Sequence, residues 1–244
     1  MVVVIFAYTR ISTNFIAKQA IANLSQAGET IATRIDSQLS FDYDVFKDYV
    51  LGLSMTDEEI VLHLQSEINN IDVNEQPFIG FARIEDRNFI KSNGDELIYH
   101  MDYEEEDFIQ EVAIYSFDDA FKNGEQQTYI YFLVNNIVGY FDADTYLSVL
   151  FDYLYLDSNY HIIGSEGTVY YRKSELDVIP FFFDYLRDAG VNQPDIQTIL
   201  SYMMLEQNTD IITDFGNVRS VYTFNPLETD LSTLNIYLVN IYAY

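Results

Sequence analysis

The sequence contains no cysteine. This absence excludes disulfide bonds, a thiolate nucleophile and every metal site built on cysteine sulfur. Basic residues are also few, because 12 lysines and arginines stand against 39 aspartates and glutamates, for a formal net charge of −27 at pH 7. Since phosphate groups bind through lysine and arginine, this balance argues against a nucleic-acid partner and against docking on an anionic membrane surface.

Long hydrophobic runs are absent as well. A helix needs about 20 apolar residues to cross a membrane, and the uncharged start of the chain, Met1–Tyr8, ends at Thr9 and Arg10. This start also lacks the charged beginning and the small-residue cleavage site of a signal peptide. Two interpretations remain open: a short buried strand or helical turn, or the outer end of a membrane helix. The amphipathic stretch that follows without a break favours the second.

The residues that are present favour a folded protein. Apolar residues make up 49% of the 244 positions, and the chain has 21 tyrosines and 18 phenylalanines. A chain of this composition buries a core and is not disordered, and its length suffices for one large or two small domains. An acidic, tyrosine-rich surface without cysteine suits a protein that faces the outside of a bacterial cell.

The N-terminal stretch from Ile11 to about Leu53 has the pattern of one long helix. Apolar residues recur every three or four positions, at Ile16, Ala20, Leu24, Ala27, Ile31 and Ile35. This spacing predicts an amphipathic helix. About 43 residues at 1.5 Å each give a rod of roughly 60 Å, which predicts a helix that spans more than one module.

After a short helix that begins near Ser54 or Thr56 and ends near Asn69, the pattern changes to that of strands and repeats itself. The hairpins predicted at Phe81–Gly94 and Tyr153–Gly167 both read as strand, acidic turn, strand and glycine. Each half of the chain is then predicted as two strands, a helix and three strands, although chance similarity remains an alternative. The predicted strands are 78–84, 89–92, 112–117, 128–134, 137–141, 153–156, 160–163, 210–214, 218–224 and 234–242, and the later helices are 142–151, 174–186 and 191–205.

This arrangement resembles the double Cache (PAS-like) sensor domains of bacterial membrane receptors. The long helix, the two hairpins and the linking segment Ile137–Val149 carry the resemblance. It implies an α+β fold in which the long helix packs along two tandem PAS-like modules, each an antiparallel sheet of about five strands with flanking helices. The implied division is residues 1–70 for the start and the long helix, 71–145 for a membrane-distal module and 146–244 for a membrane-proximal module.

The resemblance also implies a function. The chain would be the extracytoplasmic small-molecule-sensing region of a membrane-anchored signalling protein that pairs as a homodimer through the long helix. It would itself be no enzyme and need no cofactor, and its output domain would be a diguanylate cyclase or, alternatively, a histidine kinase or chemoreceptor. Members that bind amino acids use an Arg-x-Trp-Tyr motif, but this chain has no tryptophan, so that mode of recognition is not implied.

The distal module is the predicted place for a ligand. Arg83 interrupts an apolar strand and would pair with a ligand carboxylate through two hydrogen bonds, unless it lies on the solvent face of the strand. Tyrosines offer both an apolar ring and a hydroxyl to a small molecule, although most of the tyrosines must be ordinary packing. The predicted ligand-binding residues are Arg83, Tyr99, Asp102, Tyr103, Tyr115 and Asp144, the last for a cationic group.

No pattern in the sequence indicates catalysis. The histidines His63, His100 and His161 lie far apart, and no phosphate loop or serine-nucleophile motif is present. The acidic run Glu104–Asp107 is contiguous, whereas a calcium loop alternates its ligands, and Asp142 or Asp144 is explained by capping of a helix. Two rival functions remain open: a free-standing surface-binding or adhesion protein, and an extracellular hydrolase whose site is built from distant acids.

Overall fold

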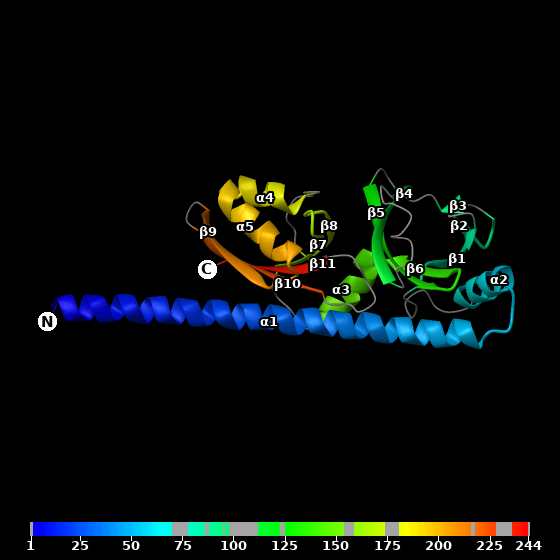
Figure 1. Cartoon of the computed structure of the whole chain (residues 1–244), viewed down its shortest axis with the longest axis horizontal. Coiled ribbons are helices and arrows are strands. Elements are labelled where there is room, and N and C mark those ends of the chain that lie inside the picture. Colours follow the sequence, from blue (N-terminus) through cyan, green and yellow to red (C-terminus); the bar gives the residue numbers. More distant parts are fainter. Residues whose placement is uncertain are drawn as a thin grey trace.

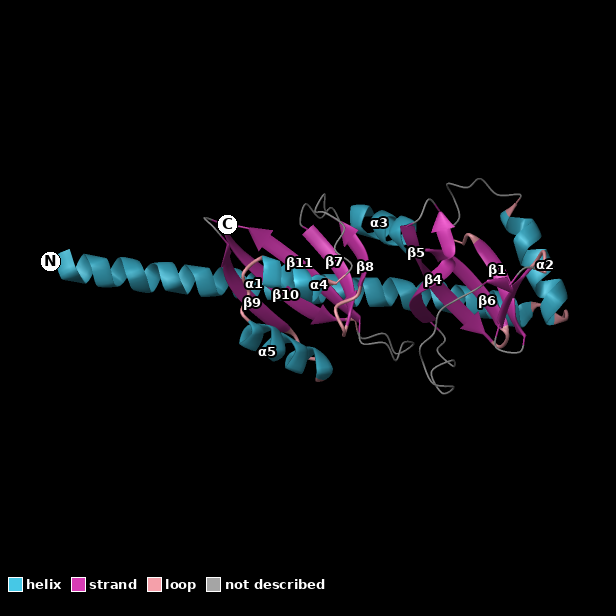
Figure 2. Cartoon of the chain, turned by 90° about the horizontal axis from the view of Figure 1, so that it is seen from above, coloured by secondary structure: helices cyan, strands magenta, loops and turns pink. Residues whose placement is uncertain are grey.

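A computed structural model of the chain describes residues 2–69, 78–85, 88–94, 96–97, 112–122, 125–153, 159–173, 181–215, 218–227 and 236–243. These residues form two antiparallel sheets that lie one after the other along a single long helix, α1 (Val2–Gly52) (Figures 1 and 2). We name the sheet nearer the N-terminal end of α1 the proximal sheet and the other the distal sheet. The N-terminal end of α1 extends beyond the proximal sheet (Figure 1).

The buried face of α1 explains its length. Ile31, Ile35, Leu39, Tyr43, Phe46 and Val50 are buried and recur every three or four residues, so one stripe of the helix faces the sheets. The predicted long helix is confirmed, but it begins at Val2 instead of Ile11. The interpretation of Met1–Tyr8 as a short strand is therefore wrong, because Val2–Tyr8 is helical. None of the helices in the described ranges is long and apolar enough to span a membrane.

A short helix, α2 (Asp57–Ile68), follows α1 at its far end. The Thr56 side chain accepts from the Glu59 backbone amide, and the Glu59 side chain accepts from the Thr56 amide. This reciprocal capping box satisfies two free donors at the helix start, as the sequence predicted for Thr56. Ile60, Val61 and Leu64 are buried, and α2 packs beside the first strand, where the Phe81 amide donates to the Gln65 side chain.

The distal sheet has six strands in the order β3-β2-β1-β6-β5-β4, all antiparallel. Five were predicted; the additional one, β3, is only two residues long and lies in a segment predicted to be helix or loop. The strands are β1 (Gly80–Glu85), β2 (Asn88–Lys91), β3 (Glu96–Leu97), β4 (Val112–Lys122), β5 (Glu125–Val134) and β6 (Ile137–Asp142).

Helix α3 (Ala143–Tyr153) leads into the proximal sheet, whose five strands have the order β8-β7-β11-β10-β9. Two helices cover its upper face and α1 its lower face (Figure 1). The elements are β7 (Asn159–Gly164), β8 (Val169–Lys173), α4 (Phe182–Asp188), α5 (Gln193–Met204), β9 (Thr209–Phe215), β10 (Val218–Pro226) and β11 (Ile236–Ala243).

The strand orders show that the fold repeats. With the short β3 set aside, the distal order β2-β1-β6-β5-β4 and the proximal order β8-β7-β11-β10-β9 are the same permutation of five consecutive strands. In both sheets the last strand lies in the centre, beside the first. The internal repeat and the two-module α+β architecture predicted from the sequence are therefore confirmed, whereas the domain boundaries stay a prediction.

The second hairpin was predicted at the wrong place. Tyr153 is the last residue of α3 and starts no strand, and the hairpin that corresponds to β1–β2 is β7–β8. The cause is the apolar pair Leu147 and Phe151, which is buried four residues apart on one face of α3. Phe151 stacks on Tyr160 at 5.3 Å between ring centres, so packing extends the helix. Residues 154–156 lie outside the described residues.

Candidate functional site

The distal sheet has two different faces, and one of them packs against α1. Phe81, Phe132 and Phe141 belong to the same buried cluster as Tyr43 and Phe46 of α1. The ring centres of Phe46 and Phe81 lie 6.1 Å apart, as do those of Phe46 and Phe132. We call this side of the sheet the helix face.

The opposite side carries tyrosines. Successive residues of a strand point to opposite faces, so Tyr129 and Tyr131 point away from the helix face, on which Ile130 and Phe132 lie. Tyr131 pairs with Tyr140 of β6, and the rings of Tyr129 and Tyr140 meet edge to face at 5.8 Å. Phe89 joins them, 5.9 Å from Tyr131. We call Phe89, Tyr129, Tyr131 and Tyr140 the tyrosine face.

All four side chains of the tyrosine face are buried. Burial, and to a smaller degree the neighbouring Tyr129, raises the pKa of Tyr140 to about 12, so this hydroxyl stays protonated at neutral pH. Neutral hydroxyls set among aromatic rings combine apolar contact with a hydrogen-bonding group, which is the composition of small-molecule sites. The tyrosine face is therefore the candidate ligand surface.

Four of the six residues predicted to bind a ligand have side chains outside the described part of the chain. Tyr115 lies on β4, and its backbone pairs with that of Tyr129, which places it at a register position beside the tyrosine face. Tyr99, Asp102 and Tyr103 fall outside the described residues, and so do His100 and the acidic run Glu104–Asp107. Their roles stay predictions.

Arg83 and Asp144 are described. Arg83 pairs in the sheet with Ile137, a residue of the helix face. Its guanidinium forms an ion pair with Glu85 at 2.8 Å, and its side chain is 23% exposed. In this structure the carboxylate partner of Arg83 thus comes from its own strand, and Arg83 lies on the side of the sheet opposite Tyr131. Asp144 is exposed in the first turn of α3.

The neighbouring acid, Asp142, caps α3. Its Oδ1 accepts from the backbone amide and from the hydroxyl of Thr145, both at 2.8 Å. Asp142 therefore caps the N-terminal end of α3, which carries the positive end of the helix dipole, as the sequence predicted. Among the described residues, no group of three or more histidine, aspartate or glutamate side chains could hold a metal ion.

The corresponding face of the proximal sheet is filled by its own helices. Phe182, Leu186, Ile199 and Met203 of α4 and α5 pack against Tyr222, Phe224 and Val239 of the sheet. His161 is buried there, with its ring centre 5.5 Å from that of Phe182. His63 lies far away on α2, so these two histidines share no site.

The sequence analysis missed Phe89, Tyr129, Tyr131 and Tyr140. In β5, tyrosine or leucine alternates with isoleucine, phenylalanine or valine, so both faces look apolar in the sequence. The available signal was that Tyr129 and Tyr131 stand two positions apart, so they share one face of the strand. Once the other face is known to pack against a helix, this places both tyrosines on the face away from it.

Comparison with known proteins gives matches by structure alone. No protein-family model matches the chain, and no curated protein matches its sequence. The extracellular domain of rpHK1S-Z16, a protein assigned as a histidine kinase, matches with 11% identity, a TM-score of 0.54, and coverage of 93% of this chain and 95% of that one. The corresponding domain of mmHK1S-Z3 matches with 11% identity, a TM-score of 0.56, and coverage of 92% and 94%.

A chemoreceptor matches equally well. The ligand-binding domain of the Pseudomonas aeruginosa PAO1 amino-acid chemoreceptor PctC, in complex with GABA, has 13% identity, a TM-score of 0.56, and coverage of 91% of this chain and 99% of that one. The chain therefore has the fold of these sensor domains over both modules, and the fold implied by the sequence resemblance is confirmed. A diguanylate cyclase, the first choice for the output domain, finds no support among these neighbours.

Proposed function

We propose that this chain is the extracellular small-molecule-sensing domain of a membrane-anchored bacterial signalling protein. The observation that carries the proposal is the match over more than nine-tenths of this chain to sensor domains. One of those domains, that of PctC, was solved with a small molecule bound. A match of this extent includes α1 and both sheets, so it covers the parts that a sensor needs for binding and for transmission.

The proposed ligand site lies on the tyrosine face of the distal sheet. The face opposite it is occupied by α1, and the corresponding face of the proximal sheet is filled by α4 and α5. Tyr131 and Tyr140 supply hydroxyls between aromatic rings. The backbone of Tyr115 on β4 pairs with that of Tyr129 on β5. Tyr99, Asp102, Tyr103 and Asp144 stay proposed contacts of this site, whereas Arg83, which lies on the helix face, stays a proposed contact only for a ligand that reaches beyond the tyrosine face.

Helix α1 transmits the signal in this proposal. It packs on both sheets through one continuous stripe, so a change in the packing of the distal sheet alters its position against the proximal sheet. A ligand shifts such an equilibrium only by its different affinity for the two packings. Two copies pair through α1, and the output domain is a histidine kinase or a chemoreceptor signalling domain; the neighbours favour these classes over a diguanylate cyclase.

A thermal-shift screen against amino acids, organic acids, amines and nucleobases tests the proposal. A binding compound raises the melting temperature in proportion to the logarithm of its concentration above Kd. Tyr131→Phe and Tyr115→Phe should each weaken binding about 3- to 10-fold, the value of one hydrogen bond. Tyr202→Phe is the matched control, because Tyr202 is exposed on α5.

One result would contradict the assignment of the site to the tyrosine face. Equal affinity of Tyr131→Phe, Tyr115→Phe and the wild type for a compound that binds would place the site elsewhere. Arg83→Ala tests the predicted role of Arg83: loss of binding would include Arg83 in the site, whereas unchanged binding would exclude it. Sedimentation equilibrium on the same samples checks pairing through α1, and a monomer at all concentrations would contradict it.

A further inference from the structure

A groove of about 290 Å³ opens on the helix face of the distal sheet, between α1, α2 and α3. Phe46, Phe78, Phe132 and Phe141 form its floor. These rings contact one another, with Phe78 lying 5.3 Å from Phe46 and 5.5 Å from Phe141 between ring centres. The floor is therefore a continuous aromatic surface, on the side of the sheet away from the tyrosine face.

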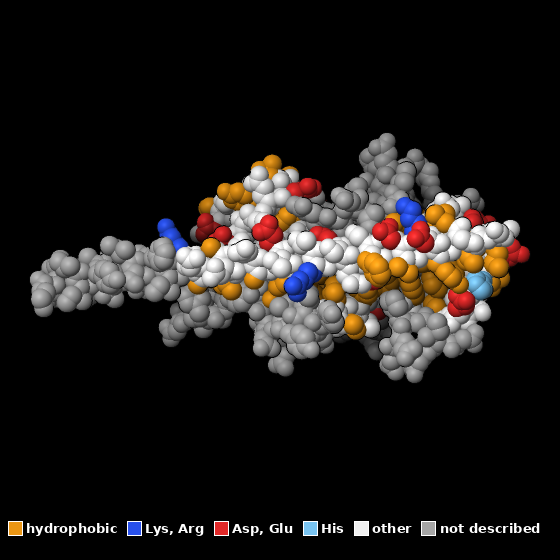
Figure 3. All heavy atoms as spheres, turned by 90° about the horizontal axis from the view of Figure 1, so that it is seen from below, with side chains coloured by type: hydrophobic (Ala, Val, Ile, Leu, Met, Phe, Trp, Pro, Cys, Tyr) orange, Lys and Arg blue, Asp and Glu red, His pale blue; other side chains and the backbone are white. Residues whose placement is uncertain are grey.

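Apolar side chains at the rim of the groove are exposed to solvent. Phe41, Val45 and Tyr49 recur every four residues along α1 and are 63%, 55% and 42% exposed. Figure 3 shows this apolar stretch along the distal half of α1. Exposed apolar area of this kind costs about 25 cal/mol for each Å², so a ligand that covers the rim gains free energy. Exposed apolar patches commonly mark binding surfaces.

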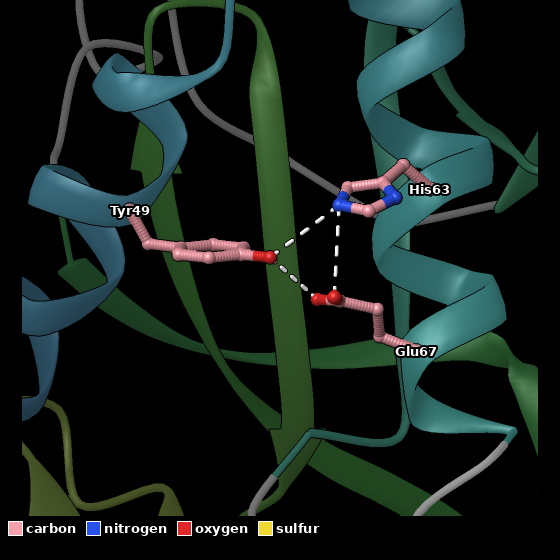
Figure 4. A network of polar contacts seen from close by, with 3 residues as sticks. All are labelled: Tyr49, His63 and Glu67. Carbon is pink, nitrogen blue, oxygen red and sulfur yellow. Dashed lines mark hydrogen bonds and ion pairs between the residues drawn. The ribbon is translucent and has the colours of Figure 1, made fainter.

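Among the described residues that line the groove, both charged ones are acidic. They are Asp42 of α1 and Glu67 of α2. Tyr146 of α3 donates to Asp42 Oδ2 at 2.5 Å, and Gln38 donates to Asp42 Oδ1 at 2.8 Å. Tyr49 donates to Glu67 Oε2 at 2.6 Å, and His63 lies 3.6 Å from Glu67 Oε1 (Figure 4). These contacts orient both carboxylates, and each oxygen keeps a lone pair for a further donor.

We propose that this groove binds a small amphipathic amine. The ammonium group pairs with one of the two lining carboxylates, Asp42 or Glu67, and with the faces of the surrounding rings, which attract cations, while the apolar body covers the aromatic floor. Charge selects this occupant, because an amine supplies the counter-charge for Asp42 and Glu67, whereas an anionic or neutral ligand leaves both carboxylates without one. The site goes beyond the proposed sensor site, because it lies on the other face of the sheet.

Isothermal titration with 2-phenylethylamine, and with 2-phenylethanol as its neutral counterpart, tests the proposal. The wild-type chain should bind the amine at least about tenfold more tightly than the alcohol, since only the amine forms charge-assisted hydrogen bonds. The double variant Asp42→Asn/Glu67→Gln should lose this difference. Asp44→Asn/Glu58→Gln is the matched control, because it removes the same charge from exposed positions of the same two helices.

Several outcomes would overturn the proposal. They are the absence of amine binding at millimolar concentration, equal affinity for amine and alcohol, and equal loss of affinity in the control variant. Loss of amine binding in Tyr131→Phe with retention in Asp42→Asn/Glu67→Gln would assign the amine to the tyrosine face. Dissociation of a dimer by Phe41→Ser would assign the groove to a second copy of the chain. Circular dichroism melts of every variant confirm that each one is folded.

Discussion

Tyr140 is a residue at which the burial of the tyrosine face can be measured. Its side chain is 8% exposed, and its ring lies over Gly80, the residue opposite it in the sheet, where a Cβ would collide with the hydroxyl. Burial raises its pKa from 10.0 to about 12, because an ionised phenolate loses solvation inside the protein.

The prediction for Tyr140 concerns alkaline pH. Since the folded pKa lies above the unfolded one, this tyrosine stabilises the fold below about pH 10, and the contribution is lost as the pH rises through about 12. The tyrosinate absorbance of the wild type minus that of Tyr140→Phe should therefore stay near zero at pH 10 and appear near pH 12. In guanidinium chloride, which unfolds the chain, the same absorbance difference should appear at about pH 10, the pKa of an unburied tyrosine. A difference that develops near pH 10 in the folded protein would contradict the burial of Tyr140.

Single residues were predictable where the interaction is local in sequence. Thr56 was predicted as a cap beside Ser54, and Asp142 beside Asp144. Both predictions were possible because the partners of a cap lie three residues away. The side of the sheet on which Arg83 lies could not be predicted in this way. The ion pair of Arg83 with Glu85 is local, since the two residues are two positions apart on one strand. The position of Arg83 on the helix face depends on the register between β1 and β6, and register is set by contacts that are distant in sequence.

At the scale of elements, α1 meets the proximal sheet at a glycine. A Cβ at Gly28 would collide with the side-chain amide of Asn225 on β10, and Asn225 is buried. Gly28 thus lets the helix approach the strand closely. Gly52, at the other end of α1, has no such neighbour: in the described part of the chain, nothing lies within 4 Å of a Cβ built there.

These two glycines give a matched pair of variants in one helix. Gly28→Ala should lower the free energy of unfolding by about 1–3 kcal/mol, because the added methyl group overpacks a tight contact. Gly52→Ala should raise it by up to about 1 kcal/mol, because alanine favours the helix. Urea unfolding followed by circular dichroism measures both. Stabilisation by Gly28→Ala would show that the helix and β10 are not in close contact.

Elements were predictable where one period of apolar residues dominated. The helical spacing of apolar residues from Ile16 to Ile35 predicted α1, and the buried stripe from Ile31 to Val50 has the same spacing. The strand start predicted at Tyr153, which is the last residue of α3, was wrong for the opposite reason. From Tyr146 to Leu156 almost every residue is aromatic, aliphatic or small, so the segment fits strand and helix equally. Packing of Leu147 and Phe151 in the core decided for the helix, and the sequence does not contain that information locally.

For the whole molecule, the central feature is that one core joins both modules. The cluster that includes Phe132 and Phe141 of the distal sheet also includes Ile162 and Leu238 of the proximal sheet, through α1 and α3. Modules with separate cores unfold independently, whereas a shared core couples them. This continuity fits the proposed sensing function, because a change in the distal packing reaches the proximal sheet through side chains in contact.

The shared core predicts that both modules unfold together. Gly139 lies beneath the aromatic cluster of the distal sheet, where a Cβ would stand 2.8 Å from Phe78 and 3.1 Å from Phe46. Gly139→Ala should cost about 1–3 kcal/mol by overpacking, and each kcal/mol lowers the melting temperature of a chain of this size by about 2–4 °C.

A fluorescent probe in the proximal module makes the coupling visible. Because the chain has no tryptophan, Tyr202→Trp on α5 reports on the proximal module alone. Gly139→Ala, placed in the distal module, should shift the tryptophan transition by the same amount as the transition seen by circular dichroism. A tryptophan transition that stays at its original temperature while circular dichroism shows an earlier one would mean that the modules unfold separately. In that case α1 would not couple them through a common core.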